Sequence, residues 1–466
     1  MDNFIEVLDH FRNITEEYWD IHQQWMEDNS IMSYTQDLPT EEVIDRIYTI
    51  LDEFYDCVKK SRTSKHIRGM KFLKPLLRPN ASWNTELCTY YTDITQESVR
   101  FRDISIITHK NSFFNLLKLL KIVLVNLEEN ASKPIKEIQN SQGCTVSNQE
   151  SCVMRKREIY YRLKDEIDVG SGTIDDLIYT LGLVLGVKRK ALKIASSSKG
   201  MIWGDFNGME MHTGVGVMIP SMEGEEIEVW SGADFILVIE KETIFNRIIS
   251  IPNLCDEIGA NVLVMTGRGN PDYSTRRLLN ILSREKGIPA FFLCDLNIYG
   301  MEIFMNYAYG CISSLCDTQD LATPCLFWLG PFIEDIKNII PNEDPLCSQG
   351  NESKSTSASF NEFLPADEWD TDLLKNIKFS NVGKDKEKIK TIKKRAVLCQ
   401  KPSDTPELSF SQSSFPDYHS YNLSCMTTQL SHLTKSKLDL DLLLELPSFF
   451  TTYTKSKILQ ISHNLQ

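Results

Sequence analysis

The 466-residue sequence lacks the patterns that mark several large classes of protein. Its 12 cysteines include no Cys-x-x-Cys pair, which argues against a zinc ribbon or a compact disulfide framework and favours a reducing intracellular compartment. No apolar stretch follows a basic amino terminus, so we expect no signal peptide. The longest apolar run, residues 113–127, is interrupted by Lys118 and Lys121, so we expect a core helix and not a membrane span. No Gly-x-x-x-x-Gly-Lys-Ser/Thr loop occurs, so P-loop nucleotide hydrolysis is not expected.

Acidic charge is concentrated at the amino-terminal end of the chain. Residues 1–60 hold 15 acidic and 4 basic side chains and carry most of the net charge of -14. Phe4, Leu8 and Phe11 form an apolar stripe at helical spacing, which predicts a helix that docks either on a partner or on the same chain. Residues 59–78 then contain eight Lys or Arg residues and no acid. Such a segment either contacts DNA phosphates or is simply a solvated surface.

Hydrophobic periodicity and composition divide the chain into five units. Helices predicted at 112–127, around Tyr160 and at 173–185, followed by a small ribbon, have the makeup of a winged-helix unit that docks on DNA. The predicted units are an acidic helical extension at 1–97 with the basic segment 59–78, a winged-helix domain at 98–224, a parallel α/β domain at 225–345, a largely disordered polar insertion at 346–430, and a helical segment at 431–466 that packs on the α/β domain.

Two strands of the predicted α/β domain deliver a carboxylate at their ends. Apolar strands that alternate with helices indicate a parallel sheet covered on both faces. One such strand precedes Glu240 and another precedes Asp295. The carboxyl ends of neighbouring parallel strands meet at one edge of a sheet, and carboxylate oxygens suit a hard divalent cation. Glu240 and Asp295 are therefore candidate metal ligands.

The segment Arg157-Glu-Ile-Tyr-Tyr161 supplies a candidate nucleophile. A phenol has an ordinary pKa of about 10 and attacks poorly unless cations or a base ease its ionisation. Arg155, Lys156 and Arg157 lie within two helical turns of Tyr161 and are suited to favour the phenolate or to hold a scissile phosphate. Tyrosine attack on a phosphodiester conserves the ester, so this chemistry needs no nucleotide. A Tyr-Tyr pair among 16 tyrosines is no surprise by itself.

Several ordered motifs resemble those of the A subunit of topoisomerase VI, a type IIB topoisomerase, and of its meiotic relative, the sporulation-eleven family that makes DNA double-strand breaks. The resemblance covers about residues 100–345. Segment 157–161 resembles the nucleophile signature, in which the second tyrosine attacks, and segment 197–200 resembles a winged-helix motif. Segments 239–242, 266–276 and 295–300 resemble motifs of the family's Toprim domain.

The resemblance implies a winged-helix (CAP-like) domain followed by a Toprim α/β domain, and an ATP-independent transesterase that initiates meiotic recombination through a 5′-phosphotyrosyl link. It implies double-stranded DNA as substrate, Mg²⁺ or Mn²⁺ as cofactor, and a homodimer in which the tyrosine of one subunit meets the metal site of the other. The implied partners are other meiotic break-forming proteins and a topoisomerase VI B-like subunit, on chromosomes in the nucleus and not at a membrane. The implied site residues are Tyr161 and Arg157 for catalysis, Glu240, Asp295 and Asn297 for the metal, and Lys199, Arg268 and Arg276 for DNA.

Three positions depart from the family pattern. Asn297 replaces the family's second aspartate, Ile298 replaces a proline, and Ala308 replaces a lysine. The amide at 297 removes one negative charge, so we expect a weakened metal site that needs more Mg²⁺ or prefers Mn²⁺. The alanine at 308 is expected to weaken DNA contact. These departures keep two alternatives open: a non-cleaving, DNA-binding scaffold, and a general topoisomerase VI A subunit.

Overall fold

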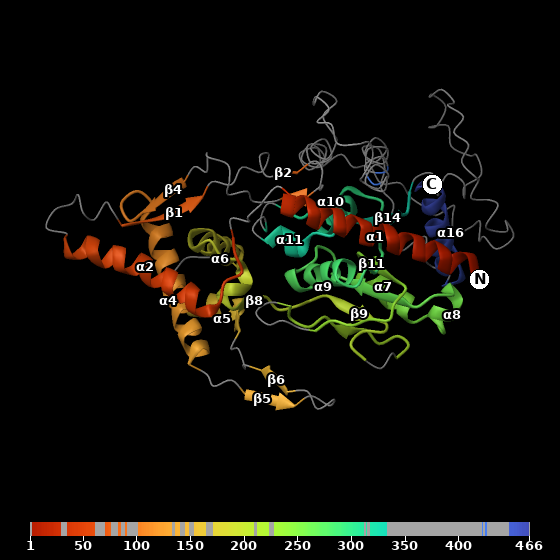
Figure 1. Ribbon diagram of the computed structural model, residues 1–466, viewed down its shortest axis with the longest axis horizontal. Coiled ribbons are helices and arrows are strands. Elements are labelled where there is room, and N and C mark those ends of the chain that lie inside the picture. The colour runs from red at the N-terminus through yellow and green to blue at the C-terminus, as the bar shows by residue number, and fades with distance from the viewer. Residues whose placement is uncertain are drawn as a thin grey trace, which may run out of the picture.

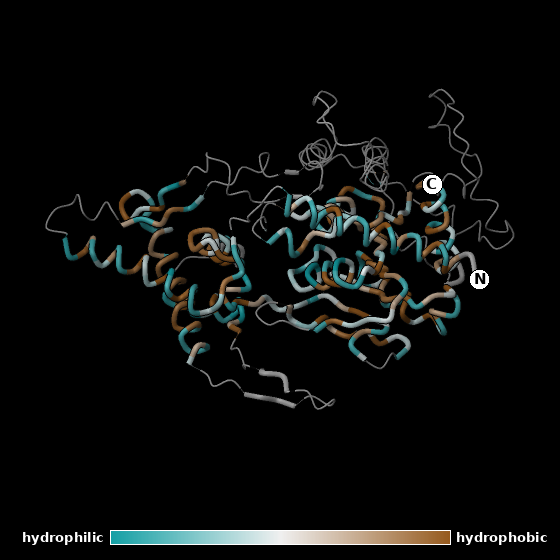
Figure 2. Tube along the Cα trace, viewed as in Figure 1, coloured by the Kyte–Doolittle hydropathy of each residue, from teal (hydrophilic) through white to brown (hydrophobic). Residues whose placement is uncertain are grey.

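The computed structural model contains two hydrophobic cores, one in a helical domain and one in an α/β domain (Figure 1). Colouring by hydropathy shows apolar segments facing inward in both and polar segments outward (Figure 2). The structure describes residues 2–28, 35–60, 70–75, 83–84, 89–90, 101–132, 136–139, 145–148, 153–164, 171–208, 212–222, 228–311, 314, 317–332, 422, 425 and 447–465.

The helical domain packs its helices around a cluster of phenylalanines. The ring centroids of Phe54, Phe72 and Phe113 lie 5.2 to 5.4 Å apart, which joins α2 and α4 to a two-stranded sheet. The predicted helices at 112–127 and 173–185 and the Tyr-Tyr helix are confirmed. The elements are α2 (Thr40–Lys59), β1 (Lys71–Pro75), β4 (Phe101–Ser105), α4 (Lys110–Ala131), β7 (Met154–Arg155), α5 (Lys156–Leu163), α6 (Ser171–Leu185), the 3-10 helix η1 (Arg189–Leu192) and β8 (Ile194–Ala195).

Short strand pairs accompany this domain. Strand β1 pairs antiparallel with β4, and β7 pairs parallel with β8. Two further antiparallel pairs join β5 (Lys136–Gln139) to β6 (Thr145–Asn148), and β2 (Trp83–Asn84) to β3 (Thr89–Tyr90), of which β3 contacts α11 (Thr318–Leu321) of the α/β domain. The winged-helix assignment of this domain stays a prediction. None of the helices in the described residues has the length and apolar character that crossing a membrane requires.

The α/β domain is built on a six-stranded sheet of order β10-β9-β12-β11-β13-β14. Strands β12, β11, β13 and β14 run parallel to one another, as predicted, and are buried along their full length. The strands are β9 (Met201–Trp203), β10 (Val217–Met218), β11 (Phe235–Ile239), β12 (Val262–Thr266), β13 (Ala290–Leu293) and β14 (Leu326–Gly330), and the helices are α1 (Asp2–Asp28), α7 (Glu242–Ile249), α8 (Leu254–Ile258), α9 (Tyr273–Arg284), α10 (Ile298–Ala308), α11 (Thr318–Leu321) and α16 (Pro447–Leu465).

The boundary between the two domains lies earlier than predicted. Strands β9 and β10 fall inside the segment 98–224 that was predicted as winged-helix domain, yet β9 pairs antiparallel with β12 in the α/β sheet. Ile194 still packs in the helical core, whereas Ile202 packs in the α/β core. The chain therefore crosses between these residues, and the antiparallel strands extend the parallel sheet at one edge.

The first helix packs on the α/β domain of its own chain. The ring of Phe11 meets Phe291 at 5.0 Å and Phe327 at 4.8 Å between centroids, both edge to face. Trp19 Nε1 donates to Ser283 Oγ at 3.3 Å. The sequence left two roles open for this apolar stripe, and in the structure it docks on the same chain. Figure 1 shows α1 lying along this domain with α16 near its amino-terminal end.

Two expectations about the carboxyl-terminal part need correction. Asn422 lies within the predicted disordered insertion, yet it is fully buried, and its side chain accepts from Trp328 N and donates to Leu326 O, so it pairs with strand β14. The leucine-rich run 438–446 by itself predicts a helix that ends at Pro447, but Pro447 begins α16, because a proline is tolerated in the first turn of a helix. Residues 438–446 lie outside the described residues. Helix α16 packs on the α/β domain, as predicted.

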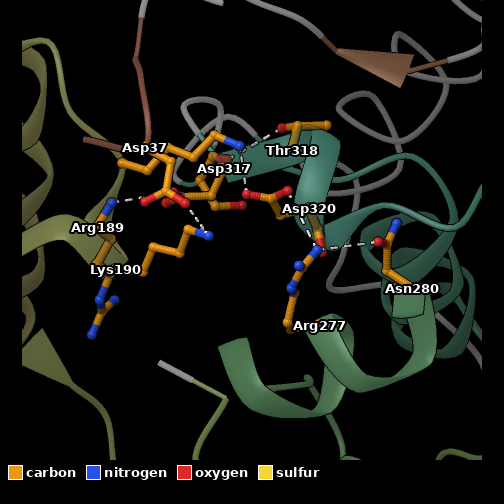
Figure 3. A network of polar contacts seen from close by, with 10 residues as sticks. Asp37, Arg189, Lys190, Arg277, Asn280, Asp317, Thr318 and Asp320 are labelled. Atoms are coloured by element: carbon orange, nitrogen blue, oxygen red, sulfur yellow. Dashed lines mark hydrogen bonds and ion pairs between the residues drawn. The ribbon is translucent and has the colours of Figure 1, made fainter. Parts of the chain in front are cut away.

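Buried acids join the two domains. Asp320 accepts from Lys188 Nζ at 2.7 Å and from Arg277 Nη1 at 3.3 Å, and Asp317 accepts from the backbone N of Arg189 at 3.3 Å. Figure 3 shows these side chains gathered where η1 meets α9 and α11, with Lys190 paired to Asp37.

The same cluster holds two carboxyl groups with opposite pKa shifts. Burial, and then the nearby charge of Asp320, raises the pKa of Asp317 to about 6. Burial alone would also raise the pKa of Asp320, but Lys188 and Arg277 outweigh it, so that pKa is lowered. The basic side chains of both domains therefore keep Asp320 charged at the junction.

Candidate active site

Tyr161 presents its phenol to solvent from helix α5. Ile159 and Leu163 are buried and anchor the helix, whereas 61% of Tyr161 is exposed. Its ring meets Tyr160 edge to face with centroids 5.5 Å apart, and Lys164 Nζ lies 5.3 Å from its centroid. The second tyrosine of the pair is thus the accessible one, and a cation lies over its ring.

The basic residues around Tyr161 differ from those that the sequence singled out. Lys156 is paired with Asp175 in the next helix, which commits its charge elsewhere. Arg157 lies one turn before Tyr161 and is exposed, so it stays a candidate for holding a phosphate. Lys164 was missed, although its spacing of three residues from Tyr161 places the two side chains on one helical face.

Glu240 and Asp295 meet at the edge of the sheet, as expected from the strands that precede them. Strands β11 and β13 are hydrogen-bonded neighbours, with Ile239 opposite Leu293. The backbone N of Asp295 donates to Glu240 Oε2 at 2.9 Å, and Asp295 and Glu240 are 4% and 7% exposed. Lys241 Nζ contacts Asp295 Oδ2 at 2.9 Å. The two carboxylates therefore face one place, and a lysine ammonium supplies positive charge there.

Gly300 makes room for this pair of acids. A Cβ at this position would lie 2.3 Å from the Asp295 carbonyl oxygen and 3.1 Å from Glu240 Oε2. Cys294 lies beside the same acids, and burial, followed by the charges of Glu240 and Asp295, raises the pKa of its thiol well above the ordinary value. The thiol is therefore neutral and does not add a charged ligand.

Asn297 caps helix α10. Its Oδ1 accepts from Tyr299 N at 2.8 Å and from Gly300 N at 2.9 Å, and its Nδ2 approaches Asp295 Oδ2 at 3.4 Å. Because both bonds need an acceptor, the oxygen is committed to the helix terminus. As a metal ligand Asn297 stays a prediction, and its oxygen has a different role in this structure.

The donor set fits a divalent cation through two carboxylates. Oxygen ligands of Glu240 and Asp295 match the preference of Mg²⁺ and Mn²⁺. In the described part of the chain no group of three or more His, Cys, Asp or Glu side chains is placed to hold a metal ion. Waters and phosphate oxygens commonly complete the shell of Mg²⁺ in such sites.

The three predicted DNA ligands lie in different settings. Lys199 is exposed, and its backbone N donates to Asp272 Oδ2, which holds the loop. Arg268 has a positive φ of 53°, and its Nη2 pairs with Glu242 Oε1 at 2.9 Å. Arg276 is only 5% exposed and lies against the junction of the two domains. Contact with DNA stays a prediction for all three, and Arg276 would need the junction to open.

Comparison with known proteins identifies the α/β domain. The family model for the Toprim domain of Spo11 and the topoisomerase 6 A-subunit matches residues 235–398. The chain is 32% identical over 200 residues to meiotic recombination protein SPO11 of Homo sapiens, covering 41% of this chain and 50% of the relative. Residues 235–398 are thus similar to the Toprim domain of Spo11 and the topoisomerase 6 A-subunit, and about two fifths of the chain is similar to SPO11.

Further relatives carry the same name in distant organisms. The chain is 27% identical over 244 residues to SPO11-1 of Oryza sativa subsp. indica, covering 51% of this chain and 58% of the relative. It is 30% identical over 188 residues to spo-11 of Caenorhabditis elegans, covering 39% and 43%. The chain thus spans about half the length of these relatives.

The Toprim match places the acids of the sheet edge inside the family's domain. It begins at β11 and includes Glu240 and Asp295, and it ends at residue 398, within the segment 346–430 that was predicted as an insertion. Ala308, another of the three departures from the family pattern, is fully buried, as are its neighbours Tyr307 and Tyr309. The expectation that its missing charge weakens DNA contact is not supported by this position, because an interior side chain does not reach a phosphate.

Proposed function

We propose that this chain cleaves DNA by a topoisomerase-like transesterification that initiates meiotic recombination. The observation that carries the proposal is an exposed tyrosine on a basic helix in a chain whose Toprim domain joins Glu240 and Asp295 at one sheet edge. The names of the relatives, meiotic recombination proteins, supply the biological setting. Because the chain spans about half of each relative, the activity is a proposal for this chain.

The proposed reaction exchanges one phosphoester for another. Tyr161 Oη attacks the phosphorus of a DNA phosphodiester, the bond from phosphorus to the 3′ oxygen breaks, and the phenolic proton ends on that oxygen. The products are a 5′-phosphotyrosyl ester and a free 3′ hydroxyl. Arg157 lies one turn before Tyr161 on α5 and Lys164 Nζ lies 5.3 Å from the Tyr161 ring centroid, and both cations would favour the approach of a phosphate.

Glu240 and Asp295 would hold a divalent cation, Mg²⁺ or Mn²⁺, with Asn297 beside them. When bound, such an ion stabilises negative charge on the phosphate and its leaving oxygen. Lys241 Nζ contacts Asp295 Oδ2 at 2.9 Å, so its ammonium would share that carboxylate with the cation. Lys199 and Arg268 are proposed to contact DNA phosphates, and Arg276 to do so only from an opened junction.

The assembly that we propose follows the family. Tyr161 lies on the helical domain, which we propose to be a winged helix, and its ring contacts are Tyr160 and Lys164 on its own helix. Two subunits would therefore combine one chain's tyrosine with the other chain's acids. A topoisomerase VI B-like partner and other break-forming proteins would join them on chromosomes in the nucleus.

A second candidate is a non-cleaving homologue that binds DNA as a scaffold. The observation that favours it is the use of the Asn297 oxygen as a helix cap, which leaves two carboxylates for the cation. A general topoisomerase VI A subunit shares the first chemical step with the leading proposal and differs only in its biological setting.

The test is to isolate the protein under denaturing conditions from meiotic cells and to measure covalently attached DNA. We expect adducts in the wild type and in Tyr160→Phe, and none in Tyr161→Phe. Tyr160→Phe is the matched control because it removes a neighbouring phenol on the same helix. Equal adducts in both variants would assign the attack to another residue. No adduct in any of the three proteins, with each present on chromatin, would favour the scaffold.

A further inference from the structure

A cavity of about 370 Å³ lies where the helical domain meets the Toprim domain. Tyr179 and Arg189 line it from the helical domain, and Arg276 and Ser314 line it from the Toprim domain. Tyr161, Glu240 and Asp295 are not among its lining residues. The cavity is thus separate from the proposed cleavage chemistry, and its size suits a small ligand.

Arg276 gives this cavity a buried positive charge with unused hydrogen-bonding capacity. The side chain is 5% exposed, and its Nη1 donates to Ser314 Oγ at 3.1 Å and to Cys311 Sγ at 3.7 Å. Its Nε and Nη2 have no hydrogen-bond partner among the described residues. An unpaired buried guanidinium is strongly destabilising, so this edge calls for an acceptor.

The acids near Arg276 already have other partners. Asp317 lines the cavity and accepts from the backbone N of Arg189 at 3.3 Å. Asp320, three residues on, pairs with Lys188 and Arg277 at 2.7 and 3.3 Å. Asp175 pairs with Lys156, and it approaches Arg189 Nη1 only at 4.0 Å. These carboxylates therefore neutralise the surrounding basic side chains and not the Nε and Nη2 edge of Arg276.

The free edge has the geometry of an oxyanion ligand. Nε and Nη2 of a guanidinium donate in parallel, and they match two oxygens of a phosphate or carboxylate. A second guanidinium, Arg189, lines the same cavity from the helical domain, where its Cζ lies 6.0 Å from the Tyr273 ring centroid. Two cations on different walls of the cavity favour an anion that carries oxygens on several sides. A tetrahedral phosphate is such an anion.

We propose that this cavity binds the phosphate group of a small molecule, with Arg276 as bidentate ligand and Arg189 as the cation contributed by the other domain. Because each wall belongs to a different domain, the ligand would hold the two domains together. A ligand that binds only the closed arrangement stabilises it by mass action. The inference uses neither the tyrosine nor the strand-end acids, but it assigns Arg276 to a small-molecule phosphate in the closed junction in place of the DNA phosphate proposed above.

The test measures thermal unfolding of the full chain with inorganic phosphate and, at equal ionic strength, with sodium chloride. We expect millimolar phosphate to raise the melting temperature by about 1 to 3 °C over chloride. The shift should be lost in Arg276→Gln and kept in Arg284→Gln, which changes an exposed arginine of the same helix. Arg276→Lys keeps the charge without the paired donors and should lose most of the shift.

Further arms identify the source of the phosphate and guard against a folding defect. Adenosine monophosphate tests a phosphorylated small molecule, and line broadening in phosphorus NMR of wild type and Ser314→Ala reports binding without unfolding. Ser314→Ala removes the anchor of Nη1 and should weaken binding several-fold. A phosphate shift equal in wild type and Arg276→Gln, or no shift and no broadening in wild type, would overturn the proposal. A shift produced by a short DNA duplex but not by phosphate would assign Arg276 to DNA instead.

Discussion

Two pairs of buried acids in this chain are neutralised in different ways. At the domain junction, Asp320 accepts from the side chains of Lys188 and Arg277, which come from different domains, and Asp317 accepts from the backbone N of Arg189. At the sheet edge, Asp295 and Glu240 are linked by a backbone N–H, and the cation in contact is Lys241, the residue next to Glu240.

The difference teaches how to separate a structural acid pair from a reactive one. Lys188 and Arg277 keep Asp320 charged between the two domains, whereas burial raises the pKa of Asp317, so only the first of these acids gains stability from its charge. The edge acids face one place from neighbouring strands, and a single lysine is easier to displace than a network. The variants below test this contrast in order of decreasing effect.

Gly300→Ala should have the largest effect, because it acts directly on the edge. In an ordinary helix the change would stabilise by about 1 kcal/mol. Here the new Cβ would lie 2.3 Å from the Asp295 carbonyl oxygen, so we expect a loss of about 3 kcal/mol in the free energy of unfolding. Chemical denaturation measures it, with Glu302→Ala on the same helix as control. An unchanged or higher free energy of unfolding would show that the sheet edge can accommodate the added methyl group.

Lys188→Met should come second, because it removes one of the two cations on Asp320. The partners are 14% and 11% exposed, and Arg277 remains, so we expect a loss of about 2 kcal/mol. The matched control is Lys60→Met, whose ion pair with Asp56 is exposed and should be worth less than about 0.5 kcal/mol. Equal losses in the two variants would remove the distinction between a junction network and surface charge.

Asp317→Asn should have a smaller effect that depends on pH. The folded-state pKa is raised to about 6 from an ordinary 3.8, so between these values the folded chain binds more protons than the unfolded chain. Wild-type stability should therefore fall as pH rises from about 4 to 6 on account of this group. We expect the variant to be about 1 to 2 kcal/mol more stable at pH 7, with no such gain at pH 4. Parallel pH curves for the two proteins would contradict this assignment.

Asn297→Asp should change stability least and cation binding most. Aspartate caps a helix about as well as asparagine, so the free energy of unfolding should move by less than about 0.5 kcal/mol. The added carboxylate should tighten Mg²⁺ or Mn²⁺ binding several-fold. Calorimetric titration of both proteins measures the binding directly. Identical midpoints would mean that position 297 does not influence the cation.

The sheet and its acidic edge could be predicted because their signals are local. Runs such as 235–239 are apolar throughout, and this pattern predicts buried parallel strands. The meeting of Glu240 with Asp295 then follows because the carboxyl ends of neighbouring parallel strands lie at the same edge of a sheet. The cap made by Asn297 was also visible in principle, since asparagine is a favoured cap. Because Asn297 also lies in a segment that resembles a metal-binding motif, the sequence predicted a metal ligand there and not a helix cap.

The remaining features depend on contacts between distant segments. Nothing near Lys188 in the sequence points to Asp320, and the strand pairing of β9 with β12 moved the domain boundary. Asn422 was assigned to an insertion because its neighbours are polar, while its burial depends on the edge of β14. Contacts between distant segments produce no periodic pattern in a single sequence, so local composition cannot predict them.

The packing of α1 on the Toprim sheet has a consequence for synthesis of the chain. Trp19 bonds to Ser283, a separation of 264 residues, so α1 is made long before its docking surface exists. At about 5 to 20 residues per second, the helix waits on the order of 10 to 50 seconds with its apolar stripe uncovered. The 15 acidic side chains of residues 1–60 keep this waiting helix soluble by mutual repulsion. The acidic side chains that accompany the apolar stripe thus help to keep the nascent chain soluble until its own core is complete.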